Sequence, residues 1–232
     1  MKFAGVVFDK DGTLLDFNST WLPIYQEAAD EFAGNDPQLR DRLLADHGFD
    51  LDTQRCASGS LLAAGNNREI AEAWSVNLSM KDKVDEISRR LEQIFKEQGS
   101  ICATPVKQLK ATLEQLKSSG LKLGVATADS HAGILNTLSA FEVLHQFEFL
   151  AGYDSGHGIK PSGDMVLAFC SKMQLAPHQV IVVGDNKHDI EMGRNANAGL
   201  CVGVLTGTSI RADLEPIADI VLEDISQLPD II

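Results

Sequence analysis

The chain has 232 residues, of which 44% are hydrophobic, and its formal net charge is −13. This composition is sufficient for a folded core and argues against global disorder. The acidic balance, with an isoelectric point of about 4.8, argues against nucleic acid or an anionic membrane surface as the main partner. It permits a phosphorylated substrate only where local cations or a metal offset the repulsion.

The cysteines are widely separated and form no C-x-x-C pair, so they give no zinc or redox signature. The N-terminus has no basic segment followed by an apolar one, and no apolar stretch is long enough to span a bilayer. The sequence therefore predicts reduced thiols and a cytoplasmic protein. The four cysteines are Cys56, Cys102, Cys170 and Cys201.

The first expected element is a buried strand at Phe3–Phe8, a short and partly β-branched apolar run. The block from residue 17 to residue 99 then contains no convincing strand. Its apolar residues recur at helical spacing, and broken segments separate the helices. The block therefore predicts a separate helical lid over the strand ends. Its expected helices are Trp21–Phe32, Pro37–His47, Asn67–Leu78 and Lys81–Gln98.

A further helix is expected to start near Thr104 and to stop at Gly120, after which strands and helices alternate. Alternation predicts an α/β fold with a doubly wound, mostly parallel, Rossmann-like sheet and with the first strand at its centre. The core domain is expected at residues 1–16 and 100–232, and the inserted all-α domain at residues 17–99. The later strands are expected at Leu121–Ala126, Phe147–Ala151, Val180–Val183 and Leu200–Val204, and helices at His131–Ala140 and Asp164–Met173.

Polar residues follow four of these strands at the point where each strand ends. Asp9 and Asp11 come directly after the first strand, and Gly12 beside them allows a close approach of the backbone to a ligand. In open α/β sheets, ligands bind outside the carboxyl ends of the strands, so the set is expected to converge on one crevice. The other members of the set are Thr127, Lys160, Asp185 and Asp189.

This set suits phosphoryl transfer. Asp9 can attack phosphorus to form an aspartyl-phosphate, and Asp11 can protonate the leaving oxygen and later deprotonate water. Mg²⁺ takes oxygen ligands and keeps several waters, so Asp9 and Asp185 would suffice beside a phosphate oxygen. Thr127 and Lys160 would bind the remaining phosphoryl oxygens and stabilise charge in the transition state.

The chain resembles the haloacid dehalogenase superfamily, whose four motifs are matched in order by Asp9-Lys10-Asp11-Gly12-Thr13, Thr127, Lys160-Pro161 and Gly184–Asp189. The helical insert is similar to the α-helical cap of phosphoglycolate-phosphatase-like members. The resemblance implies that Asp9 is nucleophile and metal ligand. It implies that Asp11 is the general acid/base and gives a main-chain carbonyl to the metal. Asp185 would be a further ligand, and Asp189 would support the metal shell or its loop.

The predicted function is Mg²⁺-dependent hydrolysis of a small phosphorylated metabolite by a monomer or a homodimer. Phosphoglycolate, sugar phosphates and nucleotide monophosphates all stay open. A phosphomutase similar to β-phosphoglucomutase would use the same core, and product analysis distinguishes it. A dehalogenase is disfavoured, because its chemistry needs no leaving-group acid such as Asp11. A non-catalytic protein that binds a phosphometabolite is a further alternative, but such a protein would be free to lose the polar residues at the strand ends. An activity test with Mg²⁺ distinguishes it.

Four residues of the helical block are candidates for recognising the leaving group of the substrate. One of them, Arg68, has the alternative role of a solvated helix arginine. Asp129 is expected to cap the helix that follows it, in preference to a role in specificity. The four candidates are Arg55, Ser58, Ser60 and Arg68.

Two other features receive no role. One histidine in a loop is ordinarily a surface residue, so His131, His157 and His188 are left unassigned. The stretch from Gly156 to Lys160 superficially resembles a nucleotide phosphate loop, but it lacks the full glycine spacing, and a proline follows where Ser or Thr is required.

Overall fold

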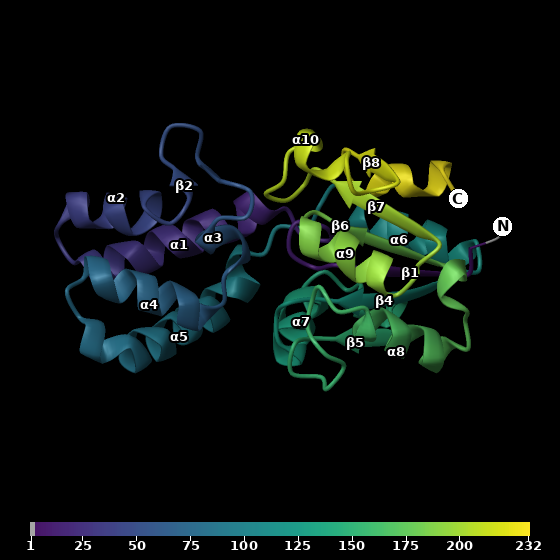
Figure 1. The fold of residues 1–232 in the computed structure, drawn as a ribbon, viewed down its shortest axis with the longest axis horizontal. Coiled ribbons are helices and arrows are strands. Elements are labelled where there is room, and N and C mark those ends of the chain that lie inside the picture. Colours follow the sequence, from purple (N-terminus) through teal and green to yellow (C-terminus); the bar gives the residue numbers. More distant parts are fainter. Residues whose placement is uncertain (1–2) are drawn as a thin grey trace. The chain divides into compact units, whose positions relative to one another are not determined.

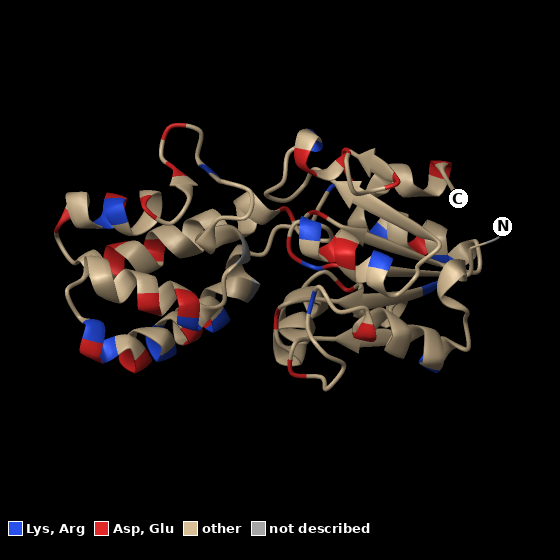
Figure 2. Cartoon of the chain, in the orientation of Figure 1, with Lys and Arg blue, Asp and Glu red and all other residues tan. Residues whose placement is uncertain are grey.

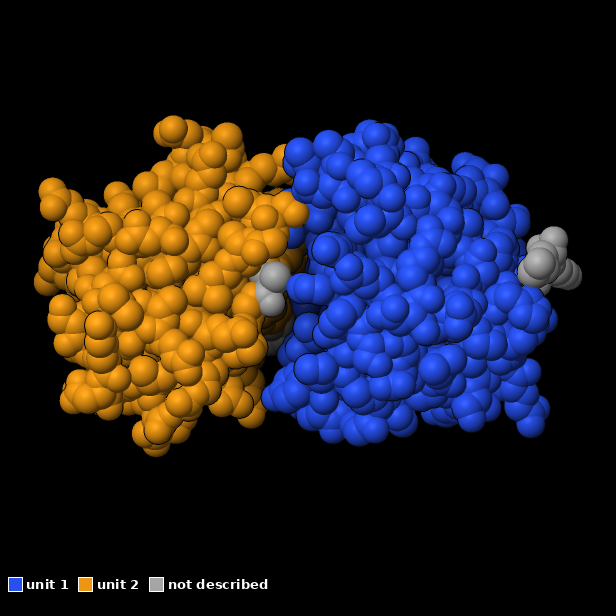
Figure 3. All heavy atoms as spheres, in the orientation of Figure 1, with its two compact units in different colours: residues 1–16, 105–232 blue, residues 17–104 orange. Residues whose placement is uncertain are grey.

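The computed structural model describes residues 3–232, except the side chains of residues 64 and 100. The chain divides into two compact units, which Figure 3 distinguishes by colour. Unit 1 consists of residues 1–16 and 105–232, and unit 2 consists of residues 17–104. The second unit is thus inserted between the first strand and the rest of the core.

Unit 1 is built on a six-stranded sheet in the order β5-β4-β1-β6-β7-β8 (Figure 1). Every neighbouring pair in this sheet is parallel. The first strand lies in the interior of the sheet between β4 and β6, as the sequence predicts. The strands are β1 (Gly5–Phe8), β4 (Lys122–Ala126), β5 (Phe149–Ala151), β6 (Val180–Gly184), β7 (Leu200–Val204) and β8 (Ile220–Leu222).

Helices cover both faces of this sheet, because successive strand residues point to opposite sides. Val6 and Phe8 of β1 join the core beneath α6, α7 and the short 3-10 helix η4, whereas Val7 joins the core beneath α8 and α9. The predicted doubly wound α/β fold is therefore confirmed. The helices of unit 1 are α6 (Leu109–Ser118), α7 (His131–Ser139), α8 (Asp164–Met173), α9 (Lys187–Asn195) and α10 (Arg211–Leu214), with η2 (Leu144–Gln146), η3 (Pro177–Gln179) and η4 (Ile225–Asp230).

Unit 2 is a helical bundle with its own core, in which Trp74 and Ile24 are fully buried. Local signals set its helix ends: Asp36 accepts hydrogen bonds from two N–H groups of α2, and Asn66 forms a capping box with Glu69 at the start of α4. Its helices are α1 (Phe17–Ala33), α2 (Pro37–Ala45), α3 (Leu61–Ala64), α4 (Asn67–Asn77) and α5 (Val84–Cys102), with η1 (Lys81–Lys83).

Unit 2 also contains a small antiparallel hairpin, so the expectation of no strand in this block is wrong. Its strands, β2 (Phe49–Asp50) and β3 (Arg55–Cys56), have two residues each. The Asp50 carboxylate accepts hydrogen bonds from the N–H groups of Asp52 and Thr53, both at 2.9 Å, and thereby forms the turn. Strands of two residues are too short to show an alternating pattern in the sequence.

The other differences from the predicted elements concern boundaries and elements that the sequence did not predict. Helix α5 continues to Cys102, so unit 2 ends at residue 104, not at residue 99. Strand β8 and helix α9 were not among the expected elements. The short β8 is only partly buried, and a sequence window of three residues does not separate such a strand from a loop.

Charged residues are rare in the strands of the sheet and frequent in the helices of unit 2. The strands of the sheet carry one charged residue, Lys122 in β4, whereas α4 and α5 carry both signs (Figure 2). All four cysteines are free thiols. Within residues 3–232, no helix is long and apolar enough to cross a membrane.

Candidate active site

Asp9 lies at the carboxyl end of the central strand. Its main-chain N–H donates to the carbonyl of Val183 on β6 at 2.9 Å, which fixes the residue at the edge of the sheet. Only 4% of the residue is exposed. A carboxylate is thus held in a buried position directly beyond two paired strands.

Asp185 and Asp189 lie beside Asp9. Asp185 follows β6, and Asp189 lies in the first turn of α9. One carboxylate oxygen of Asp189 accepts hydrogen bonds from the N–H groups of Asp185 and Asn186, both at 3.1 Å. One oxygen from each of Asp9, Asp185 and Asp189 lies within 4.8 Å of the other two. The structure therefore brings together three predicted metal-site carboxylates.

Lys160 faces this acidic cluster from the loop between β5 and α8. Its Nζ atom lies 2.5 Å from Asp9 Oδ1 and 2.5 Å from Asp189 Oδ1. The side chain is 6% exposed. The solvated loop lysine, which is the ordinary alternative for such a residue, is thus excluded.

Burial dominates the electrostatics of the cluster. Loss of solvent, with smaller contributions from Asp189 and Asp11, raises the pKa of Asp9 to about 7 against the opposing effect of Lys160. Burial, with Asp189 and Asp9, also raises the pKa of Asp185 well above its ordinary value. Burial by itself lowers the pKa of Lys160, but the Asp189 and Asp9 carboxylates outweigh it and raise the pKa. The cluster has more negative than positive groups, and a cation would stabilise it.

The donor set fits a divalent metal ion. Asp185 Oδ1 is buried and has no hydrogen-bond partner among the described residues. Such an oxygen is costly to bury unless a cation or a donor faces it. Gly12, with φ of +92°, leaves room for the Asp185 carboxylate. A Cβ atom at position 12 would lie 2.7 Å from either carboxylate oxygen of Asp185, which is too close. Three carboxylates are hard oxygen ligands of the kind that Mg²⁺ prefers.

Asp11 and Thr127 come after β1 and β4, two neighbouring parallel strands, but neither belongs to the cluster. The Asp11 carboxylate lies 2.6 Å from Lys10 Nζ and is not one of the three clustered carboxylates. Thr127, which follows β4, is buried, and its hydroxyl oxygen accepts a hydrogen bond from the N–H of Asp129 at 3.2 Å. This contact occupies an oxygen lone pair, so the hydroxyl proton can be donated to a phosphoryl oxygen.

Sequence reasoning missed the loop after β7. The N–H of Thr208 donates to Asp185 Oδ2 at 3.1 Å, and the hydroxyl of Thr206 donates to the carbonyl of Gly12 at 2.6 Å. These two contacts join a fifth strand end, that of β7, to Asp185 and to Gly12. The signal was present in Gly207-Thr208-Ser209, small and hydroxyl-bearing residues just after a predicted strand.

Comparison with known proteins agrees with this geometry. A family model described as haloacid dehalogenase-like hydrolase matches residues 6–202. The chain belongs to the haloacid dehalogenase-like hydrolase family. It is 31% identical to a phosphoglycolate phosphatase of Pasteurella multocida, and the alignment covers 98% of this chain and 97% of that protein. The family and such relatives indicate a phosphatase.

Two solved structures share the fold. A protein from Haemophilus somnus, named as a predicted phosphoglycolate phosphatase, superposes with a TM-score of 0.76 at 22% identity and covers 100% of this chain and 98% of its own. A Thermotoga maritima protein, named as a putative beta-phosphoglucomutase, has a TM-score of 0.75 at 20% identity and covers 99% and 98%. These likenesses support the haloacid dehalogenase fold and no finer assignment.

The predicted substrate-binding residues of this hydrolase outside the core all lie in unit 2. Arg55 is exposed on β3, and Ser58 is exposed in the turn that follows. Ser60 precedes α3, and its hydroxyl oxygen is buried without a hydrogen-bond partner in the described structure. Arg68 forms ion pairs with Glu72 at 3.2 Å and with Asp85 at 2.6 Å. The solvated-helix alternative for Arg68 is therefore the one that its contacts favour.

The expectation that Asp129 caps the next helix is wrong. The N-cap of α7 is Ser130, whose hydroxyl accepts a hydrogen bond from the N–H of Gly133 at 3.0 Å. One Asp129 oxygen accepts a hydrogen bond from the N–H of Ser130 at 2.6 Å, and the other lies 3.1 Å from Lys10 Nζ. A buried lysine attracts this carboxylate more strongly than a helix N-terminus does.

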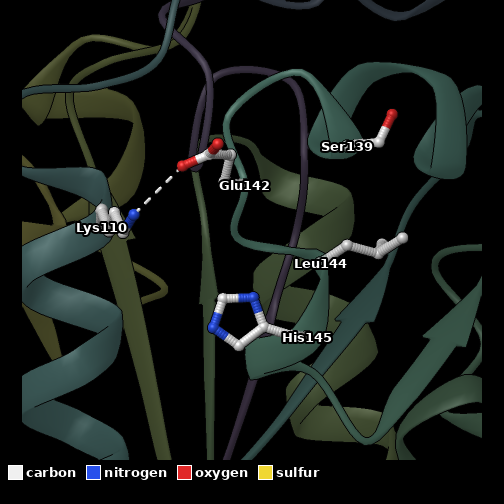
Figure 4. A pocket seen from close by; sticks show the side chains of 5 residues that line it. All are labelled: Lys110, Ser139, Glu142, Leu144 and His145. Carbon is white, nitrogen blue, oxygen red and sulfur yellow. Dashed lines mark hydrogen bonds and ion pairs between the residues drawn. The ribbon is translucent and has the colours of Figure 1, made fainter.

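Unit 1 also has an open pocket of about 570 Å³ that shares no lining residue with the acidic cluster (Figure 4). Lys110 of α6 and Glu142 form an ion pair across it at 3.4 Å. Both side chains are exposed, and no buried charge faces the pocket. The lining residues are Lys110, Ser139, Glu142, Leu144 and His145.

Proposed function

We propose that this hydrolase removes phosphate from a small phosphomonoester through an aspartyl-phosphate on Asp9, with Mg²⁺ as its metal. The observation that carries the proposal is the buried set in which Lys160 Nζ lies 2.5 Å from Asp9 Oδ1, beside Asp185 and Asp189. A buried excess of carboxylates costs stability, and buried ionisable groups with shifted pKa values cluster at functional sites.

In the proposed first step, an oxygen of Asp9 attacks phosphorus as the bond to the leaving oxygen breaks. Asp11 gives its proton to that leaving oxygen, so the alcohol departs neutral. Lys160 and the hydroxyl of Thr127 hold the phosphoryl oxygens and reduce their developing charge. In the second step Asp11 takes a proton from water, which attacks phosphorus and releases Asp9 and inorganic phosphate.

Asp9, Asp185 and the main-chain carbonyl of Asp11 would hold Mg²⁺, with Asp189 supporting the loop that carries Asp185. The bound ion supplies positive charge that screens the phosphate from the Asp9 carboxylate. Asp189 Oδ2 already accepts hydrogen bonds from two N–H groups of that loop, which fixes the backbone that carries Asp185. This supporting role therefore rests on contacts of the chain itself.

Phosphoglycolate is the first substrate to test, because relatives of this chain carry that name. A panel of phosphoglycolate, sugar phosphates and nucleotide monophosphates, with kcat/KM measured for each, tests the assignment. We expect Mg²⁺-dependent release of inorganic phosphate and a phosphoenzyme that is lost in Asp9→Asn. Full activity after exhaustive chelation, or transfer of phosphate to a second position of a sugar without release, would contradict it.

The inserted unit is proposed to act as the cap that selects the substrate. The residues of unit 2 that we expect to recognise the leaving group contribute no member to the acidic cluster. Selection and chemistry would then reside in different units. Measurements on substitutions in the two units separate these roles, as described below.

A further inference from the structure

Lys10 lies between the two aspartates at the end of β1, and its side chain is enclosed by carboxylates. Its Nζ atom lies 2.6 Å from Asp11 Oδ2 and 3.1 Å from Asp129 Oδ2. Only 2% of the side chain is exposed. A buried ammonium is costly unless it is paired, so these two contacts fix where Lys10 points.

The backbone around Lys10 is fixed as well. The carbonyl of Lys10 accepts hydrogen bonds from the N–H groups of Thr13, Leu14 and Leu15 at 3.3, 2.9 and 3.0 Å. Leu14 and Leu15 are fully buried. The loop that carries Asp11 is therefore tied to the Lys10 carbonyl by three hydrogen bonds.

Asp129 is held from several directions. Its N–H donates to the Thr127 hydroxyl oxygen, its carbonyl accepts from the N–H of Tyr153 at 2.9 Å, and its Oδ1 atom accepts from the N–H of Ser130 at 2.6 Å. Gly133 leaves the space for this carboxylate. A Cβ atom there would lie 2.2 Å from Asp129 Oδ2, the oxygen that faces Lys10. The end of β4 thus presents a fixed anion to Lys10.

We propose that Lys10 and Asp129 are positioning residues that hold the Asp11 carboxylate in one orientation for proton transfer to the leaving oxygen. The inference rests on the proposed function, in which Asp11 is the general acid/base. Proton transfer needs donor and acceptor within hydrogen-bond reach, and a free aspartate side chain samples several rotamers. The fixed ammonium of Lys10, itself held by Asp129, restricts that sampling.

The test uses the leaving group of the substrate. An alkyl phosphate needs a proton on its leaving oxygen, whereas 2,4-dinitrophenyl phosphate expels a stable anion and needs none. For Lys10→Met we expect the single-turnover rate of Asp9 phosphorylation to fall about 10²-fold with an alkyl phosphate and less than about threefold with the dinitrophenyl ester. The measurement is the ratio of the two rates relative to wild type.

Two further variants keep the test decisive if Lys10→Met does not fold. Asp129→Asn removes the anion that holds Lys10, and Gly133→Ala places a methyl group against the same carboxylate; each should shift the ratio about tenfold in the same direction. Lys10→Arg keeps a cation near Asp11 and should restore part of the rate. Lys110→Met, which removes an exposed positive charge from unit 1 (Figure 4), should leave the ratio at the wild-type value.

The outcomes separate this inference from the proposed function. If the wild-type protein forms no phosphoenzyme on Asp9 with either ester, the proposed function is wrong. If it does, and folded Lys10→Met and Asp129→Asn slow both esters equally or neither, then Lys10 and Asp129 have a structural role and the inference is overturned.

Discussion

The two units differ in whether their charged side chains are buried. Unit 1 buries the side chains of Asp9, Lys160, Asp185 and Asp189 beside one another at the strand ends, and it buries Lys10 against Asp11 and Asp129. In the described part of unit 2, the buried polar residues are Thr20 and Ser75, and its ion pairs, such as Arg68 with Asp85, are exposed. Buried charge costs stability, and it is typically retained where function requires it. The contrast indicates that unit 1 carries the chemistry, and it leaves the proposed recognition of the substrate to unit 2.

The largest effect is expected from Asp9→Asn in unit 1. Loss of a nucleophile that works as part of a set should lower kcat by about 10⁴-fold or more and abolish the trapped phosphoenzyme. Steady-state kinetics and labelled phosphate on the denatured protein measure the two effects. The matched control is Asp82→Asn on exposed η1 of unit 2, which should behave as wild type. Near-normal turnover of Asp9→Asn would show that the roles assigned to unit 1 are wrong.

Lys160→Ala should have the next largest effect. Because it removes a cation from a position common to all substrates, kcat/KM should fall by about 10²- to 10³-fold for every phosphoester tested. The diagnostic is uniformity across a panel that includes a simple aryl phosphate. A loss confined to one substrate would place Lys160 in recognition of the leaving group instead.

Arg55→Ala in unit 2 should have a smaller and selective effect. We expect about a tenfold loss of kcat/KM for the physiological substrate and less than about twofold for an aryl phosphate, which offers little for a cap to recognise. Ser58→Ala and Ser60→Ala extend the series, and Arg68→Ala should be weakest because Glu72 and Asp85 already engage its guanidinium. An even loss on all substrates would mean that the division between the units is inverted.

The smallest expected effect is on stability and concerns pH. In the folded protein the pKa of Asp9 is raised to about 7, from an ordinary value of 3.8. Between these values the folded state binds more protons than the unfolded state, so this group lowers the free energy of unfolding as pH rises. Mg²⁺ needs the carboxylate form, so its stabilisation should grow over the same range.

Thermal unfolding with a chelator and with excess Mg²⁺ measures this linkage. From about pH 5 to about pH 7.5, the increase in Tm caused by Mg²⁺ should grow by a few degrees. Asp185→Asn removes one proposed metal ligand and should abolish most of the increase at the higher pH. An increase in Tm that is largest at the lower pH would contradict a metal site built from these carboxylates.

Most of the sheet was predictable because its signals are local. Val180–Val183 and Leu200–Val204 are apolar runs bounded by turn residues, and they became β6 and β7 with one residue of difference at most. The helices Pro37–Ala45 and Asn67–Asn77 start where their caps do. The β2–β3 hairpin was not predicted, because strands of two residues are too short to show an alternating pattern in the sequence.

The sequence by itself determined where the strands end and which residue types follow them. Backbone propensity and apolar periodicity depend on residues that are close together in the chain, so they can be recognised without the fold. Only the tertiary structure decided which of these residues meet. Lys160 contacts Asp9, which lies 151 positions away in the sequence. Asp129, expected to cap a helix, instead forms an ion pair with Lys10. Such choices depend on burial, since the loss of solvent makes an ion pair prevail over a local hydrogen bond. That loss exists only once the sheet has assembled.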